Sequence, residues 1–222
     1  MHASFGFRRS TLACALLSAV GFFATPAQAG RPLDVDDAGV NAKGHGHVEI
    51  WSTRAVDGAR SWTVAPAFAP IDGFELAYLR AADQSTQDTG HTLQFKGLFT
   101  PSNENGCNQA ATVGITRRNH ALAGARYGWL INTCNQGWGS WHTNIGATQD
   151  YSESYNKPLV AMALEFSGFP VVPHIQWIAQ KQAMPQFGLG VRKAVTEQFQ
   201  IDGSFSRQGG QSIWTVGTKF SF

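Results

Sequence analysis

From residue 47 to the end of the chain, apolar and polar residues alternate with a period of two over many short segments. In 186–192, for example, Phe187, Leu189 and Val191 alternate with polar residues and glycines. This period is typical of β-strands that present one apolar and one polar face. Gly, Pro, Asp and Asn residues separate the segments, so the pattern predicts strands joined by turns.

The segments predict about 12 strands of about nine to twelve residues, which is the length that a tilted membrane-spanning strand requires. An even number returns both ends of the sheet to the same side. A ten-stranded alternative follows if two segments fuse, and the weakest boundaries lie in 100–140 and 166–174. The expected strands are 47–54, 61–69, 74–82, 91–100, 107–118, 126–135, 140–150, 158–166, 172–181, 186–196, 199–207 and 211–222.

The C-terminal residues indicate which face of these strands meets lipid. The apolar series runs through Trp214 and Val216 to the final residue, Phe222. This ending resembles the C-terminal signal of outer-membrane barrels, in which a polar residue and a glycine precede two aromatics. A soluble barrel would turn its apolar face inward, whereas a membrane barrel turns it outward. The residues that fill the places of the signal are Thr215, Gly217, Phe220 and Phe222.

The N-terminus has the order of a secretory signal peptide. Arg8 and Arg9 precede an apolar run over 11–24, and the small-residue triplet 27–29 predicts cleavage before Gly30. About 14 apolar residues are too few to span about 30 Å of hydrocarbon as a helix. Cys14 lies inside the apolar run rather than at the cleavage site, which argues against a lipoprotein.

The chain therefore divides into a cleaved signal peptide (1–29), a periplasmic or lumenal N-terminal segment (30–46) and a barrel (47–222). Charged residues make up 14% and hydrophobic residues 43%, without a later apolar run long enough for a helix to span the bilayer. The expected fold is an all-β, transmembrane, antiparallel up-and-down β-barrel in the outer membrane. Its expected partners are outer-membrane lipid and the barrel-assembly machinery, and it is expected to be monomeric.

A formal net charge of +2 gives no reason to expect a nucleic-acid partner. Aromatic residues lie mostly near the expected strand ends, where they suit interfacial girdles, although a packing role fits each of them equally well. These aromatic residues are Trp51, Trp62, Tyr78, Trp129, Trp141, Tyr151, Tyr155 and Trp214.

Two cysteines remain after cleavage, in a compartment where thiols oxidise. A hairpin centred near residue 120 brings together residues whose numbers sum to about 241, so Cys107 faces Cys134 and a disulfide near the periplasmic rim is expected. The same register places Val113 and Ile115 on the face of polar Gln109, which predicts a bulge or a one-residue slip. A metal site is a weaker alternative, because no paired histidines lie nearby.

The polar series of the strands points into the lumen. Carboxylates and cations are mixed there, so they either pair and fill the interior or line a water-filled passage with little charge preference. The candidate lumen residues are Glu75, Lys96, Glu165, Gln176, Gln180, Arg192, Asp202 and Lys219.

No catalytic residue, metal or cofactor is expected. Outer-membrane phospholipases carry a His-x-Ser pair, but here His142 is followed by Asn144 in the position of the serine. A histidine without a hydroxyl partner cannot activate a nucleophile. His45 and His47 lie in a Gly-rich stretch and are read as solvated side chains rather than metal ligands.

The segment before the first strand is acidic and rich in turn residues. Asp34, Asp36 and Asp37 are candidates for a plug that meets Lys or Arg in the lumen. The same stretch resembles the opening of the MetA-pathway phenol-degradation family of outer-membrane transporters. In the opening, the matching residues are Arg31-Pro32-Leu33, Asp36-Asp37-Ala38-Gly39, Lys43-Gly44 and Glu49. Further along the chain, the similar residues are Trp141-His142, Asn144, Gly146, Gly188, Gly190, Arg192, Trp214 and Val216-Gly217.

This resemblance implies an outer-membrane barrel that assists the passage of small, often aromatic or apolar molecules. The two cysteines depart from the family pattern, and no residue set identifies a phenol site. The sequence thus favours a channel or transporter for a small-molecule substrate. The alternative is a closed structural or surface-interaction barrel whose lumen is packed with polar side chains.

Overall fold

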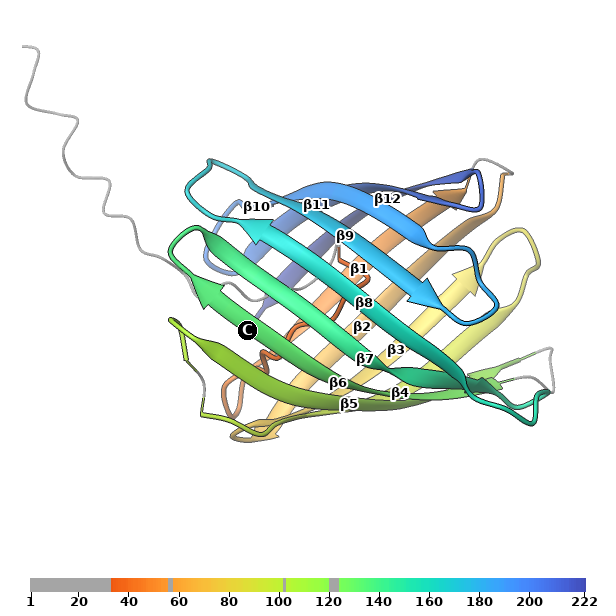
Figure 1. Ribbon diagram of the computed structural model, residues 1–222, viewed down its shortest axis with the longest axis horizontal. Helices are drawn as coiled ribbons and strands as arrows, with labels where there is room; N and C mark the ends of the chain where they lie inside the picture. Colours follow the sequence, from red (N-terminus) through yellow and green to blue (C-terminus); the bar gives the residue numbers. More distant parts are fainter. Residues whose placement is uncertain (1–32, 56–57, 102, 120–123) are drawn as a thin grey trace, which may run out of the picture.

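The computed structural model describes residues 33–55, 58–101, 103–119 and 124–222, so the expected signal peptide lies outside the described residues. Twelve antiparallel strands form one closed barrel, as the alternation predicted (Figure 1). Each strand pairs with its neighbours in sequence, and β12 pairs with β1. The strands are β1 (Gly46–Ala55), β2 (Arg60–Ile71), β3 (Phe74–Asp83), β4 (Thr89–Leu98), β5 (Cys107–Arg118), β6 (Gly124–Gln136), β7 (Gly139–Asp150), β8 (Lys157–Phe166), β9 (Val172–Gln180), β10 (Gln186–Ala194), β11 (Phe199–Gln208) and β12 (Gln211–Ser221).

Strands β1 and β12 pair to close the barrel, and the start of β1 meets the end of the chain at one rim. The backbone N–H of Gly46 donates to the carbonyl of Phe222, and the N–H of Phe222 donates back to Gly46, both at 2.9 Å. We call this end the terminal rim and the other end the opposite rim. The side chains of Phe220 and Phe222 are exposed on the outer face, and Thr215 lies inside, where its hydroxyl is 3.3 Å from that of Thr53.

The two faces of the barrel differ in the sense expected of a membrane barrel. Large apolar side chains are exposed around the outer surface, with Val216 at 67%. Buried charged and polar side chains gather on the inner face, among them Glu165 and His174. A water-soluble barrel has the reverse arrangement, because its apolar side chains form the core. In the described ranges, no helix is long and apolar enough to cross a bilayer.

Cys107 and Cys134 face each other across β5 and β6 and form the predicted disulfide at the terminal rim. The expected bulge or slip between these strands is wrong, because their register is continuous. Gln109 faces outward like Val113, but it lies two residues from the start of β5, near the terminal rim, where polar groups can reach water. The register shift lies instead between β2 and β3, at Phe68 to Ile71.

Breaking the disulfide is expected to lower the unfolding free energy by about 3–4 kcal/mol, because the bond closes a long loop in the unfolded chain. The sequence separation is 27 residues. The measurement is the urea unfolding midpoint of the refolded protein with and without reductant. A Cys107→Ser, Cys134→Ser variant controls for other effects of the reductant, because its midpoint should not change when reductant is added. A variant midpoint equal to that of the oxidised wild type would contradict the prediction.

The girdle interpretation is wrong for two of the aromatic residues. Trp51 and Trp129 point into the barrel, on the same faces as Glu49 and Ile131. Tyr78, Trp141, Tyr151, Tyr155 and Trp214 are exposed, in agreement with an outward position. Both inward tryptophans occupy positions of the alternating pattern whose other members point inward. The alternation along the strand, rather than nearness to a strand end, therefore sets the direction of these side chains.

A candidate channel and its N-terminal segment

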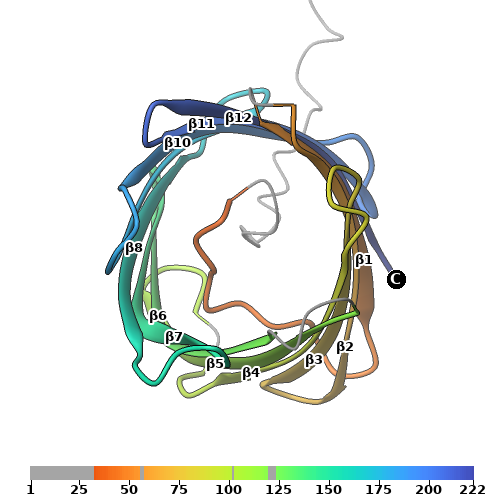
Figure 2. The ribbon, with the colours of Figure 1, turned by 90° about the vertical axis from the view of Figure 1, so that its right-hand side faces the viewer.

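The segment of residues 33–45, which we call the N-terminal segment, lies inside the barrel against the wall (Figure 2). At residues 44–45 its backbone bonds to Ala69 of β2, and further into the lumen its backbone bonds to side chains of the wall. The N–H groups of Asp34, Asp36 and Ala38 donate to Gln176 Oε1 at 2.8 Å, Asn144 Oδ1 at 2.7 Å and Thr133 Oγ1 at 2.9 Å. These wall side chains give three backbone N–H groups of the segment the hydrogen-bond partners that burial requires.

The side chains between these amides bury apolar surface. Leu33 and Val35 pack on Ala161 and Ala163 of β8. Further along, Ala38 packs on Ala110 and Ile131. The small side chains on the wall let the segment approach closely, and burial of its apolar groups favours the docked position.

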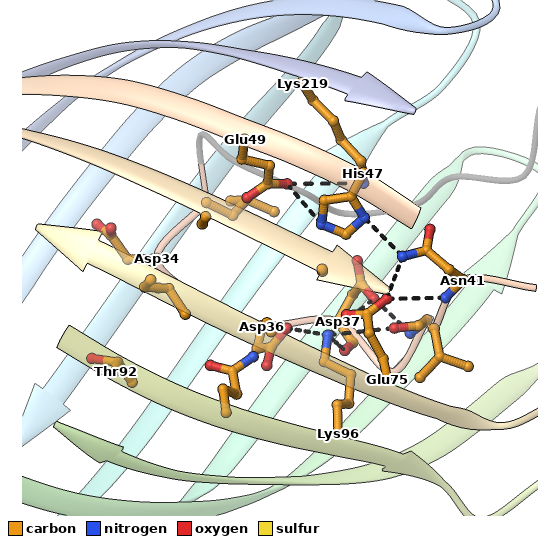
Figure 3. A pocket seen from close by; sticks show the side chains of 18 of the residues that line it. Asp34, Asp36, Asp37, Asn41, His47, Glu49, Glu75, Thr92, Lys96 and Lys219 are labelled. Carbon is orange, nitrogen blue, oxygen red and sulfur yellow. Dashed lines mark hydrogen bonds and ion pairs between the residues drawn. The ribbon is translucent and has the colours of Figure 1, made fainter. Parts of the chain in front are cut away.

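Lys96 of β4 is the main cation that holds the segment (Figure 3). Its Nζ lies 2.6 Å from Asp36 Oδ1 and 4.0 Å from Asp37 Oδ1. It also donates to the backbone carbonyls of Asp37, at 3.1 Å, and Gly39, at 3.4 Å. The other oxygen of Asp36 accepts from the hydroxyl of Thr112 at 3.1 Å. We call these contacts the Lys96 clamp.

The other two acidic residues of the segment have different surroundings. Burial raises the pKa of the Asp37 carboxyl to about 6, and the ammonium of Lys96 opposes this shift. Asp37 Oδ1 accepts from the N–H of Gly39, while the other oxygen has no hydrogen bond within the described part of the chain. Asp34 Oδ2 accepts from Gln176 Nε2 at 3.0 Å and from Gln186 Nε2 at 2.8 Å.

Near the terminal rim, Asn41 joins the segment to Glu75 of β3. The backbone N–H and the side-chain amide of Asn41 donate to Glu75 Oε2 at 3.1 and 2.6 Å. The amide also lies 2.9 Å from His47 Nδ1. No group of three or more metal-ligating side chains is found in the described ranges.

A second cluster of charges lies on the wall formed by β7 to β10. Arg192 Nη2 donates to Glu165 Oε2 at 2.8 Å, and His142 Nε2 is 3.5 Å from the same oxygen. His174 is fully buried beside them, and neither of its ring nitrogens has a hydrogen bond within the described residues. The alternating pattern of the sequence predicted that His142 and His174 lie on the polar face. Their position beside Glu165, however, depends on the pairing of four strands.

His142 also links this cluster to the N-terminal segment. Its Nδ1 lies 2.9 Å from Thr133 Oγ1, the oxygen that accepts from Ala38 N–H. Thr133, His142 and Glu165 therefore follow the order hydroxyl, imidazole and carboxylate of a hydrolytic triad. The expectation that His142 lacks a hydroxyl partner is therefore wrong, because the pairing of β6 with β7 supplies Thr133. The Thr133 hydroxyl is buried beneath the segment and also accepts from the N–H of Ala38.

The remaining lumen candidates also have partners on the wall. Lys219 Nζ is 3.8 Å from Glu49 Oε1, and Gln180 bonds to the hydroxyl of Thr148. Asp202 is buried against Gly217, where a Cβ atom would lie 2.6 Å from its Oδ1. Gly217 therefore leaves room for the carboxylate of Asp202. It also occupies the glycine position of the C-terminal motif.

A cavity of about 380 Å³ lies beside the segment, against the inner face of β1 to β4. Inward Ala65 and Ala67 of β2 keep this side of the lumen wide. Trp51 lines it together with Tyr127 and Trp129, whose rings stack with centroids 4.5 Å apart. Tyr127 donates to Gln94 at 2.6 Å.

Two further cavities open near the terminal rim. One, of about 780 Å³, lies between residues 37–42 of the segment and the residues near 72–73, 100–101, 103–105 and 135–139. The other, of about 410 Å³, is lined by Glu165, Arg192 and Lys219. Open space thus borders the N-terminal segment on two sides, in the cavity of about 380 Å³ and in the cavity of about 780 Å³.

Comparison with solved structures supports the fold. The chain is similar to the KdgM porin in complex with disordered oligogalacturonate, with a TM-score of 0.70 and 8% identity over 79% of this chain and 99% of that chain. Omp33 of Acinetobacter baumannii gives 0.52 and 8% identity over 80% and 98%. Outer membrane phospholipase A from Escherichia coli gives 0.50 and 10% identity over 87% and 94%.

No family model and no curated protein matches the chain. The resemblance to the MetA-pathway family therefore stays a prediction. The solved structures share the outer-membrane barrel fold, and at these identities they establish the fold alone. The function has to be argued from the lumen itself.

Proposed function

We propose that the protein is an outer-membrane channel for small solutes, obstructed by its own N-terminal segment. In this setting the terminal rim faces the periplasm and the opposite rim faces the exterior. The observation that carries the proposal is the position of residues 33–41, which occupy a polar lumen and leave cavities around themselves. Non-covalent contacts hold the segment, so its release would join these spaces into one passage.

Two features support a location in a lipid bilayer. The outer surface is apolar, and the closed barrel satisfies its backbone polar groups internally, as lipid requires. The signal-peptide pattern of residues 1–29 and the aromatic ending at Phe222 support the outer membrane as that bilayer. Non-enzymatic passage is preferred over hydrolysis, because the Thr133 hydroxyl is covered by the segment.

The lining of the cavity beside the segment supports a preference for small aromatic or apolar solutes. Trp51, Tyr127 and Trp129 offer aromatic surface, and Ala65 and Ala67 offer room opposite polar groups. Charged side chains such as Glu49, Glu75 and Lys96 line the same cavity, so an aromatic solute that also carries a polar group fits it best.

The test is single-channel recording in planar bilayers with the full-length mature protein and with a variant that lacks residues 33–42. We expect larger and longer-lived conductance steps from the deletion variant, because the lumen loses its obstruction. A variant with a Gly/Ser segment of equal length in place of 33–42 is the matched control and should conduct like the deletion. Recordings with phenol and with a neutral sugar as added solutes test the aromatic preference.

The alternative is a closed barrel whose polar side chains fill the lumen. The pairing of Glu165 with Arg192 and of Lys219 with Glu49 favours it, because paired charges can serve as a core. Folded protein that gives no steps with or without residues 33–42 would exclude the channel and support this alternative.

A further inference from the structure

The outer surface of β8 to β11 carries an apolar groove of about 700 Å³. It lies on the lipid-facing side, and its floor follows the pairing of β9 with β10. Gly188 and Gly190 occupy the inward positions of β10, and Phe187 and Leu189 occupy the outward positions that face the groove. The walls include Met162, Leu164, Ile175, Trp177, Phe187 and Leu189.

One cation lies at the end of this groove toward the opposite rim. Arg207 lines the groove, and its neighbour across the β10–β11 pair is Phe187. It is exposed and stands one residue before the end of β11. None of the ion pairs found within the described ranges involves Arg207. Arg207 therefore borders apolar surface, and no carboxylate of the described residues pairs with its guanidinium.

We propose that this groove and Arg207 form a binding site for a phosphate-bearing lipid of the outer leaflet. The acyl chain lies along Trp177, Phe187 and Leu189, and the phosphate accepts hydrogen bonds from Arg207. The fork of an arginine matches a phosphate in two parallel hydrogen bonds, and its stem tolerates apolar surroundings. The proposal rests on the outer-membrane location proposed above, which sets the opposite rim at the level of the outer-leaflet headgroups.

Two features favour a phosphorylated lipid over a free anion or an uncharged chain. A free phosphate would use Arg207 but gain nothing from about 700 Å³ of apolar groove. An uncharged chain would fill the groove but offer no anion to the guanidinium at the boundary between apolar surface and headgroups. A lipid with both parts satisfies the groove and the cation together.

The experiment measures lipid retention by native mass spectrometry of the full-length mature protein in mild detergent, with added lipid A as the probe. We expect Arg207→Gln to weaken retention about tenfold, which corresponds to about 1.4 kcal/mol. The matched control is Arg80→Gln, an outward arginine of β3 whose guanidinium lies 5.0 Å from the Trp62 ring centroid. Filling the groove with Leu189→Trp is expected to weaken retention as well, whereas Leu93→Trp on β4 is its control.

Wild-type protein should retain lipid A better than the same lipid after its phosphates are removed. Equal retention of the two lipids would overturn the role of Arg207, and equal retention by all variants would overturn the site. Equal loss in the Arg80 and Leu93 controls would do the same, because it would show general lipid adhesion. Channel recordings of the same preparations keep this outcome separate from the channel proposal.

Discussion

A Lys96→Met variant is expected to spend about 10²-fold more time open than the wild-type channel. Lys96 is buried, and removing it leaves the carboxylates of Asp36 and Asp37 in the lumen without their nearest cation. Removing one partner of a buried ion pair costs about 3–5 kcal/mol. Asp36 is about a quarter exposed, so we take the lower end, which corresponds to about 10²-fold in a two-state equilibrium.

The measurement is the open fraction in single-channel recordings at fixed voltage and salt. Lys43→Met is the matched control, because Lys43 is exposed in the same segment and has no part in the Lys96 clamp. A second substitution, Asp36→Asn, should restore part of the closure in the Lys96→Met background, because it removes one of the uncompensated charges. Equal open fractions for the Lys43 and Lys96 variants would show that the Lys96 clamp does not hold the segment.

The largest effect on folding is expected from Glu165→Gln, with a loss of about 3–5 kcal/mol in unfolding free energy. Glu165 and Arg192 are both buried and 2.8 Å apart. Glutamine keeps the shape and one hydrogen-bond acceptor but leaves the guanidinium charge in the barrel wall. His142, 3.5 Å from the same carboxylate, loses its anionic neighbour too.

Urea unfolding of protein refolded into lipid vesicles measures this loss, with Glu197→Gln as the matched control. Glu197 is exposed in the turn after β10, so its change is expected to stay within about 0.5 kcal/mol. Adding Arg192→Met to Glu165→Gln should recover part of the stability, because an apolar side chain needs no counter-ion. A loss as small as that of the control would mean that the pair contributes no more than a surface contact.

The barrel could be predicted from sequence because each strand carries its own evidence. Alternation with a period of two sets the faces locally, and the cysteine pair fixes the register of β5 against β6 without reference to other strands. The expected slip there was wrong because a single strand face can pass from polar Gln109 to apolar Val113 as it leaves the rim.

The candidate site could be predicted only in part. The alternating pattern predicted that Lys96, Glu165 and Arg192 point inward, and the acidic composition of 34–37 predicted a candidate plug. Which wall residue meets which part of the segment depends on contacts between residues 95 to 142 positions apart, and no local pattern encodes them. Trp51 and Trp129 were missed as lumen aromatics because nearness to strand ends was weighed above their parity.

The N-terminal segment is also a tethered ligand of the lumen. Gly44 and His45 bond to Ala69 of β2, which anchors the segment at the terminal rim. Only residues 42–43 separate this anchor from the first lumen contact at Asn41, so Asn41 of a released segment stays within about 10 Å of the anchor. Its effective concentration at the wall therefore stays in the millimolar range or above. Closing then requires neither a partner protein nor a soluble blocker, and each wall contact only has to be weak to keep the lumen occupied.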